Sequence, residues 1–141
     1  MLSKTPAYTL RAAVIAVLLL TMALATGCAS TKVLKLDAGD NGSQVELEKG
    51  RVLSITLESN PTTGYRWEVE ESGEPVLSQI GEATYELESG RDDKLVGAPG
   101  LETFQFEAMG TGDATLKLVY HRPWEEEEEP LETFSIRVTV R

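Results

Sequence analysis

The sequence predicts an all-β domain, an antiparallel β-sandwich that follows an N-terminal signal peptide. From residue 33 onward, apolar and polar residues alternate over short stretches, which is the period of a strand with one buried face. Turn-forming residues separate these stretches at short intervals, and almost no segment has the 3.6-residue period of a helix. Many short strands with frequent turns are typical of a two-sheet sandwich of about seven strands.

The first 27 residues are predicted to be removed and to take no part in the fold. Lys4 and Arg11 precede an apolar run over residues 12–25, which is too short and too weakly flanked for a membrane span. Small residues follow, and then Cys28, the only cysteine. This arrangement resembles a bacterial lipoprotein signal, although Ala25 stands where that signal prefers leucine.

The lipoprotein resemblance implies cleavage after Gly27 and a diacylglycerol on the Cys28 sulfur, so that residues 28–32 become a lipidated tether. Ala29 stands where retention in the inner membrane usually requires aspartate, so we expect an anchor in the outer membrane, facing the periplasm. The alternative is an ordinary signal peptide with an incidental free thiol. Once acylated, Cys28 supplies neither a disulfide nor a nucleophile.

The acidic composition excludes nucleic acid as a partner. The chain has 23 acidic and 13 basic residues and a formal charge of −10, and it lacks the interleaved basic and aromatic residues of strand-binding proteins. Residues 1–27 carry two basic and no acidic residues, so their removal leaves 114 residues with a formal charge of −12. This length is enough for one sandwich domain, which we place at residues 33–141.

Strands are predicted wherever apolar side chains occupy alternate positions. They lie around residues 33–36, 45–47, 52–58, 65–69, 103–108, 114–120 and 134–141. Residues 76–80 and 83–87 form either two further strands or one strand with an irregularity at Gly81. Between the first two strands, the segment 37–43 ends in Asn-Gly, which favours a hairpin turn; a calcium loop would need carboxylates at alternate positions.

Trp67 is predicted to be a core residue. It shares one face of its strand with Tyr65 and Val69. A tryptophan on a middle strand is typical of the buried centre of a sandwich, although no disulfide flanks it in this sequence.

Three loops of unusual composition are predicted to meet at one end of the sandwich. In an antiparallel sandwich every second connection lies at the same end, and the connections over residues 60–64, 91–100 and 121–130 satisfy this condition. The first contains proline, threonine and glycine, the second is rich in glycine, and the third carries Trp124 and the run Glu125–Glu129. We therefore expect one composite binding surface.

The first of these loops is expected to be stiff. Pro61 fixes φ, Thr62 and Thr63 are β-branched, and Gly64 permits positive φ. A stiff loop loses little entropy when it docks, which suits a binding loop. The alternative is an ordinary turn between two strands, since Asn-Pro and Thr-Gly are common turn pairs.

The order of these motifs resembles the chagasin family, whose members inhibit papain-like cysteine peptidases. The motifs are Asn-Pro-Thr-Thr-Gly-Tyr-x-Trp over residues 60–67, Gly-x-x-Gly over residues 97–100 with an aromatic strand after it, and Arg-Pro-Trp over residues 122–124. Three motifs in order are more specific than any one, and the resemblance covers nearly all of residues 33–141. It implies an immunoglobulin-like antiparallel β-sandwich and reversible inhibition by occlusion of the active-site cleft.

The resemblance also implies which residues bind the peptidase. Residues 60–65 would enter the active-site cleft, with Thr62 and Thr63 nearest to the catalytic cysteine and histidine. Residues 97–101 would brace one wall of the cleft, and residues 122–124 the primed-side wall. The implied binding residues are Asn60, Pro61, Thr62, Thr63, Gly64, Tyr65, Gly97, Ala98, Pro99, Gly100, Leu101, Arg122, Pro123 and Trp124.

The third loop allows more than one interpretation. Arg122 and Trp124 are of the residue types most enriched at binding hot spots. From the residues alone, Trp124 could equally cover the end of the sandwich, and Arg122 could pair with a neighbouring glutamate. The run Glu125–Glu129 departs from the short third loop typical of the family. It is either a solvated, self-repelling loop or a charge that steers the inhibitor toward a basic peptidase.

An enzymatic function is not expected. His121 is the only histidine, which argues against a metal site and against a Ser–His or Cys–His pair. The carboxylates lie mostly at surface-facing positions, and nothing pairs them in a pocket. We expect a monomer without cofactor or metal whose partner is a papain-like cysteine peptidase. The alternative function is an envelope adhesion or structural module that binds a protein or glycan through the same loops.

Overall fold

The computed structural model describes residues 32–87 and 97–141. The predicted signal peptide over residues 1–27, the lipidation site Cys28 and residues 91–96 of the second predicted loop lie outside the described residues. Within the two described ranges, no helix has the length and the apolar character needed to cross a bilayer.

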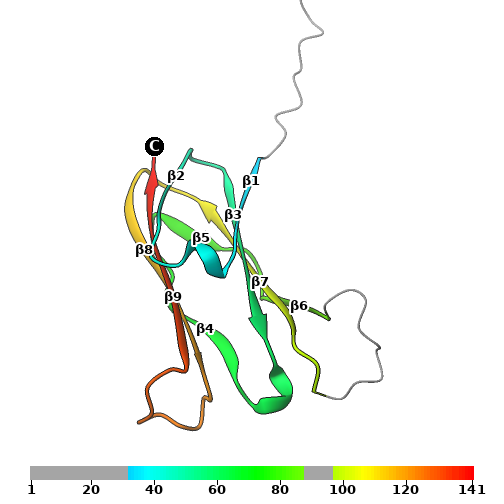
Figure 1. Ribbon diagram of the computed structural model, residues 1–141. Coiled ribbons are helices and arrows are strands. Elements are labelled where there is room, and N and C mark those ends of the chain that lie inside the picture. Colours follow the sequence, from blue (N-terminus) through cyan, green and yellow to red (C-terminus); the bar gives the residue numbers. More distant parts are fainter. Residues whose placement is uncertain (1–31, 88–96) are drawn as a thin grey trace, which may run out of the picture. The chain divides into compact units, whose positions relative to one another are not determined.

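The chain forms two β-sheets packed face to face (Figure 1). The strands are β1 (Val33–Leu36), β2 (Gln44–Leu47), β3 (Val52–Ser59), β4 (Arg66–Glu71), β5 (Leu77–Gln79), β6 (Thr84–Leu87), β7 (Gly100–Ala108), β8 (Gly112–His121) and β9 (Glu132–Val140). One sheet has the order β1–β3–β7–β5, with β6 also paired to β7, and the other has the order β2–β9–β8–β4. The predicted β-sandwich is confirmed, with nine strands in the described residues where about seven were expected.

The core lies between the inner faces of the two sheets, as the alternation of apolar residues predicted. The inward positions of the central strands are almost fully buried. They are Leu53, Ile55 and Leu57 on β3, Phe104, Phe106 and Ala108 on β7, Leu116 and Leu118 on β8, and Phe134, Ile136, Val138 and Val140 on β9. Because the side-chain period of a strand is two, this burial fixes which face of each strand looks inward.

The sheets are mixed rather than wholly antiparallel. β1 pairs with β3 in parallel and β2 pairs with β9 in parallel, whereas the other pairs are antiparallel. β1 and β2 follow one another in the chain but belong to different sheets. Each lies at the edge of its own sheet, β1 beside β3 and β2 beside β9.

The hairpin turn predicted for residues 37–43 is wrong. The segment contains a 3-10 helix, η2 (Ala38–Asp40), which connects the two sheets, and the Asp37 N–H donates to the Asp40 carboxylate at 2.9 Å. The Asn41 side chain donates to and accepts from the backbone of β9, at 2.9 and 2.8 Å. The local turn preference of Asn-Gly is thus overridden by hydrogen bonds to a distant strand.

The uncertain region between β4 and β7 contains two strands. β5 and β6 both pair antiparallel with β7, at different positions along it. Gly81 lies between them with a φ of +64°, a conformation that glycine adopts without strain. The irregularity that the sequence indicated at Gly81 is therefore a break between two short strands.

Trp67 is buried in the core, as predicted. Its side chain is 6% exposed. The indole Nε1–H donates to the Glu58 carbonyl on β3 at 2.9 Å, and the ring lies 5.1 Å from that of Tyr120. Trp67 on β4 therefore connects one sheet to the other near the end of the sandwich that carries the predicted loops.

Candidate functional site

The three predicted loops come together at one end of the sandwich, as far as the structure describes them (Figure 1). We call Asn60–Tyr65 the wedge loop, residues 97–99 the second loop and Arg122–Leu131 the third loop. The Asn60 Nδ2 donates to the Gly97 carbonyl at 3.0 Å, which joins the wedge loop to the second loop. The Arg122 Nε donates to the Thr63 carbonyl at 3.2 Å, which joins it to the third loop.

The wedge loop is a single turn of 3-10 helix, η3 (Pro61–Thr63), between β3 and β4. Proline occupies the start of the turn, where its missing N–H and its fixed φ suit a helix. Gly64 ends the turn with a φ of +83° and donates its N–H to the Pro61 carbonyl at 3.0 Å. The positive φ that the sequence permitted at Gly64 is therefore required by the turn.

Both threonine hydroxyls of the wedge loop hold the turn together. The Thr62 hydroxyl donates to the Asn60 side-chain oxygen, and the Thr63 hydroxyl donates to the Asn60 carbonyl, both at 2.6 Å. Both residues are exposed on their outer side. The hydroxyls thus contribute first to the shape of the loop, and the Thr63 hydroxyl also accepts the Tyr65 N–H at 3.4 Å.

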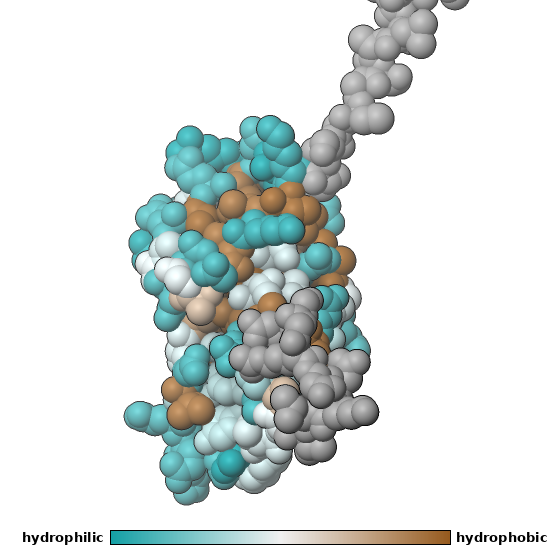
Figure 2. Space-filling model, turned by 45° about the vertical axis from the view of Figure 1, so that its right-hand side comes forward, coloured by the Kyte–Doolittle hydropathy of each residue, from teal (hydrophilic) through white to brown (hydrophobic). Residues whose placement is uncertain are grey.

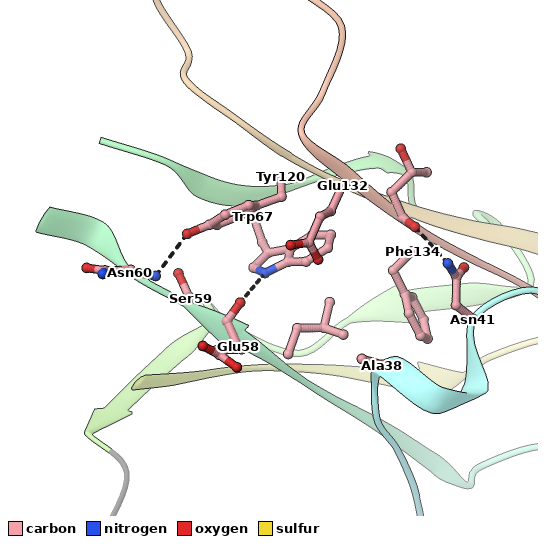
Figure 3. Close-up of a pocket in the computed structure, with 11 residues that line it drawn as sticks. Ala38, Asn41, Glu58, Ser59, Asn60, Trp67, Tyr120, Glu132 and Phe134 are labelled. Atoms are coloured by element: carbon pink, nitrogen blue, oxygen red, sulfur yellow. Dashed lines mark hydrogen bonds between the residues drawn. The ribbon is translucent and has the colours of Figure 1, made fainter. Parts of the chain in front are cut away.

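Tyr120 supports the wedge loop from inside the sandwich, whereas the sequence predicted only that it lies in a strand over residues 114–120. It is 7% exposed, and its hydroxyl accepts the Asn60 N–H at 2.9 Å (Figure 3). Its ring stacks on Tyr65 at 5.4 Å. The available sequence signal is that Tyr120 follows Leu116 and Leu118 on the inward face of its strand, and a buried tyrosine hydroxyl needs a partner.

Arg122 is directed largely into the protein. Besides its bond to the wedge loop, its guanidinium carbon lies 4.5 Å from the centre of the Tyr65 ring, and its Nη1 lies 3.2 Å from the Glu125 carboxylate. The pairing with a neighbouring glutamate, considered from the sequence, is therefore present. These contacts leave Arg122 half-buried and hold the third loop against the wedge loop.

Trp124 is exposed and rests on the wedge loop. Its side chain is 67% exposed, the highest fraction among the large exposed hydrophobic residues of the described ranges. One edge of the indole lies against Gly64. A Cβ added at Gly64 would collide with this edge, and its distance to the ring carbon Cζ2 would be only 2.9 Å. The rest of the ring faces solvent, which is the arrangement of an aromatic residue available to a partner.

The second loop contributes less surface than its sequence suggested. Gly97 lies against the wedge loop with a φ of +92°, but Gly100 and Leu101 belong to β7. Gly100 is buried, and an added Cβ would lie 2.5 Å from the Tyr85 ring. Its lack of a side chain is therefore needed for packing inside this chain, whatever it does at an interface.

The glutamate run is mostly solvated. Glu125 is half-buried beside Arg122, and residues 126–129 are exposed. His121 at the start of this region pairs with Glu68, its Nε2 lying 2.8 Å from the carboxylate. Among the described residues, no three His, Cys, Asp or Glu side chains lie together as metal ligands would.

The described surface at this end is mostly polar, apart from the exposed side chains of Trp124 and Leu131. Figure 2 shows that the lower end of the visible face, where the loops lie in Figure 1, is largely white and teal, while most brown surface lies higher. This end therefore offers polar groups and the Trp124 ring rather than a large aliphatic patch.

A hollow of about 320 Å³ lies behind the wedge loop, between β3 and the paired strands β8 and β9 (Figure 3). It is lined by Trp67, Tyr120, Phe134 and the Glu132 side chain, and by Ser59, whose buried hydroxyl has no partner among the described residues. The hollow lies to the side of the sandwich rather than at the tip of the loops.

The family comparison covers most of the domain. The model of the chagasin family peptidase inhibitor I42 matches residues 46–138. Amoebiasin-2 from Entamoeba histolytica is 32% identical over 90 residues, which make up 64% of this chain and 71% of that protein. Chagasin from Trypanosoma cruzi is 30% identical over 105 residues, which make up 72% of this chain and 93% of that protein.

The fold comparison agrees. The crystal structure of a cysteine protease inhibitor from Entamoeba histolytica matches with a TM-score of 0.68 and 28% sequence identity. The match covers 77% of this chain and 96% of that chain. The sandwich that the sequence resemblance implied is therefore shared with a solved structure.

Proposed function

The chain belongs to the chagasin family of peptidase inhibitors, and from this premise we propose that it is a reversible, non-covalent inhibitor of papain-like cysteine peptidases. It is an inhibitor and not an enzyme. The observation that best supports the proposal is that three loops are bonded into one surface at a single end of the sandwich. The wedge loop is the central element of this surface.

The wedge loop fits an active-site cleft without being a good substrate. A papain-like site holds a reactive thiolate–imidazolium pair, and attack needs a carbonyl that can reach the oxyanion hole. The carbonyls of Asn60, Pro61 and Thr63 already accept hydrogen bonds from within the chain. Because the backbone is a closed 3-10 turn rather than an extended strand, we propose that it blocks the thiolate without aligning a bond for cleavage.

The proposed contacts follow the family resemblance. The wedge loop enters the cleft, residues 97–101 brace one wall and residues 122–124 the other. Within this set, Asn60 and Gly100 are turned inward and support the surface from below. Trp124 offers the largest exposed ring.

The direct test is inhibition of papain by the domain from Ala29 to Arg141. We expect reversible inhibition that substrate competes away, since the loops occupy the cleft. A domain that is folded by circular dichroism but does not inhibit papain or a related peptidase would contradict the proposal. Binding of the loop end to an envelope protein or glycan would then favour an adhesion module.

Trp124→Ala is expected to weaken inhibition by about 2–4 kcal/mol, mainly through faster dissociation, if the ring is buried in the complex. The measurement is the inhibition constant together with association and dissociation rates against papain. Met109→Ala is a matched control, because Met109 is another exposed apolar residue, at the turn between β7 and β8 at the opposite end. Equal inhibition by both variants and the parent would remove Trp124 from the contact surface.

Replacement of Glu126–Glu129 by glutamines is expected to slow association with a basic peptidase about three- to tenfold at low salt and to leave dissociation nearly unchanged. Glu125 is kept because it pairs with Arg122. Replacement of Glu46, Glu48, Glu74 and Glu107 by glutamines, away from the three loops, removes the same number of charges and controls for net charge. Association rates that match the parent at low salt would assign the run to a solvated loop without a steering role.

We also propose that the chain is a lipoprotein of the bacterial cell envelope, anchored through Cys28. The support is the signal-like segment before Cys28 and the lipobox-like residues next to it. Cys28→Ser is expected to abolish incorporation of a fatty-acid analogue and to release the protein from the membrane fraction. Ser30→Ala, two residues away, should remain labelled and membrane-bound. A parent protein that incorporates no label would contradict the anchor.

A further inference from the structure

Asn60 uses each of its polar groups inside the protein. Its N–H donates to the Tyr120 hydroxyl at 2.9 Å, and its Nδ2 donates to the Gly97 carbonyl at 3.0 Å. Its side-chain oxygen accepts the Thr62 hydroxyl, and its carbonyl accepts both the hydroxyl and the N–H of Thr63. One residue thus connects the wedge loop, the second loop and strand β8.

Tyr120 gives the Asn60 N–H a hydrogen-bond acceptor whose position is fixed by the core. Its ring packs against those of Tyr65 and Trp67, at centroid distances of 5.4 and 5.1 Å. Its strand is hydrogen-bonded on both sides, to β4 and to β9. The position of its hydroxyl is therefore set by the core, and the same strand leads two residues later to Arg122 of the third loop.

From this geometry we infer that Asn60 and Tyr120 are positioning residues of the inhibitor. They hold the wedge loop at a fixed height and angle relative to the other two loops, and neither has to touch the peptidase to do so. The inference rests on the proposed function and adds a role for a hydroxyl that lies beneath the binding surface. A loop that is already in its bound shape binds more tightly than one that must be ordered.

Tyr120→Phe tests the inferred pair with the smallest change. The ring and its stacking are kept, but the Asn60 N–H loses the Tyr120 hydroxyl as its acceptor. We expect inhibition of papain to weaken about tenfold, in line with the loss of one half-buried hydrogen bond. The inhibition constant and the two rates are measured at a temperature where the variant is fully folded, so that the change cannot come from unfolded protein.

Two further variants of the full chain complete the test: the first separates positioning from general stability, and the second changes Asn60 itself. Val138→Ala removes core volume on β9 far from the loops, so it should lower Tm by several degrees and inhibit like the parent. Asn60→Asp keeps the oxygen that accepts the Thr62 hydroxyl but places an oxygen where the amide donated to Gly97. It should weaken inhibition at least as much as Tyr120→Phe.

Hydrogen–deuterium exchange of the free protein provides a readout that needs no peptidase. Tyr120→Phe should speed exchange of the Asn60 amide at least tenfold, while the amides of β9 exchange as in the parent. The positioning role would be overturned if Tyr120→Phe left the exchange of the Asn60 amide unchanged. It would also be overturned if the parent inhibited papain and Tyr120→Phe inhibited it equally well. A parent that shows the exchange effect but does not inhibit would instead contradict the proposed function and leave the loop-positioning role supported.

Discussion

Gly64→Val is expected to weaken inhibition of papain by at least about a hundredfold, which corresponds to roughly 3 kcal/mol of lost binding free energy. Gly64 has a φ of +83°, a conformation that costs a β-branched residue about 1–3 kcal/mol. An added Cβ would also collide with the Trp124 ring. The substitution therefore distorts the wedge loop and displaces the third loop at the same time. The measurement is the inhibition constant, with a thermal melt to show that the domain is folded.

Gly50→Val is the matched control for this prediction. Gly50 also has a φ of +83°, but nothing lies within 4 Å of the position that its Cβ would take. It belongs to the turn between β2 and β3, at the opposite end from the loops. Its variant should share the backbone strain and inhibit like the parent. Equal loss of inhibition in both variants would mean that strain lowers stability and that the contact with Trp124 has no role.

Trp67→Ala is expected to destabilise the domain by about 3–5 kcal/mol, a large part of the stability of a small domain. The substitution leaves a cavity beside Tyr120 and removes the donor to the Glu58 carbonyl. For a domain of this size the melting temperature should fall by roughly 12–20 °C. Denaturation by urea, followed by circular dichroism, would measure the free energy of unfolding directly.

Trp124→Ala is the matched control for Trp67→Ala, since the chain has two tryptophans. Trp124 is 67% exposed where Trp67 is 6% exposed, so its loss should change Tm by no more than about 2 °C. The two substitutions should therefore have different effects: Trp67→Ala lowers the stability of the domain, and Trp124→Ala weakens inhibition. A melting curve that Trp67→Ala leaves unchanged would show that the strand register assigned to β4 is wrong.

The sequence by itself determined the features that depend on near neighbours in the chain. Alternation at positions such as Leu53, Ile55 and Leu57 identified the strands and their inward faces, because the side-chain period of a strand is local. Pro61 and Gly64 identified the wedge loop as a turn of fixed shape, because each restricts or extends φ at its own position. The order of the loops then placed them at one end.

Only the tertiary structure decided which residues touch across the chain. Asn41 could not be assigned to β9 from its turn-like neighbours, and Gly100 could not be assigned to the Tyr85 ring. Likewise, the sequence indicated an inward side chain at Tyr120 and a possible glutamate partner for Arg122, but it did not identify the backbone groups of the wedge loop that these two side chains bind. Such contacts join residues tens of positions apart, and they depend on the sheet that each strand enters, its pairing partner and its register. These are set by the packing of the whole core, which no local pattern encodes.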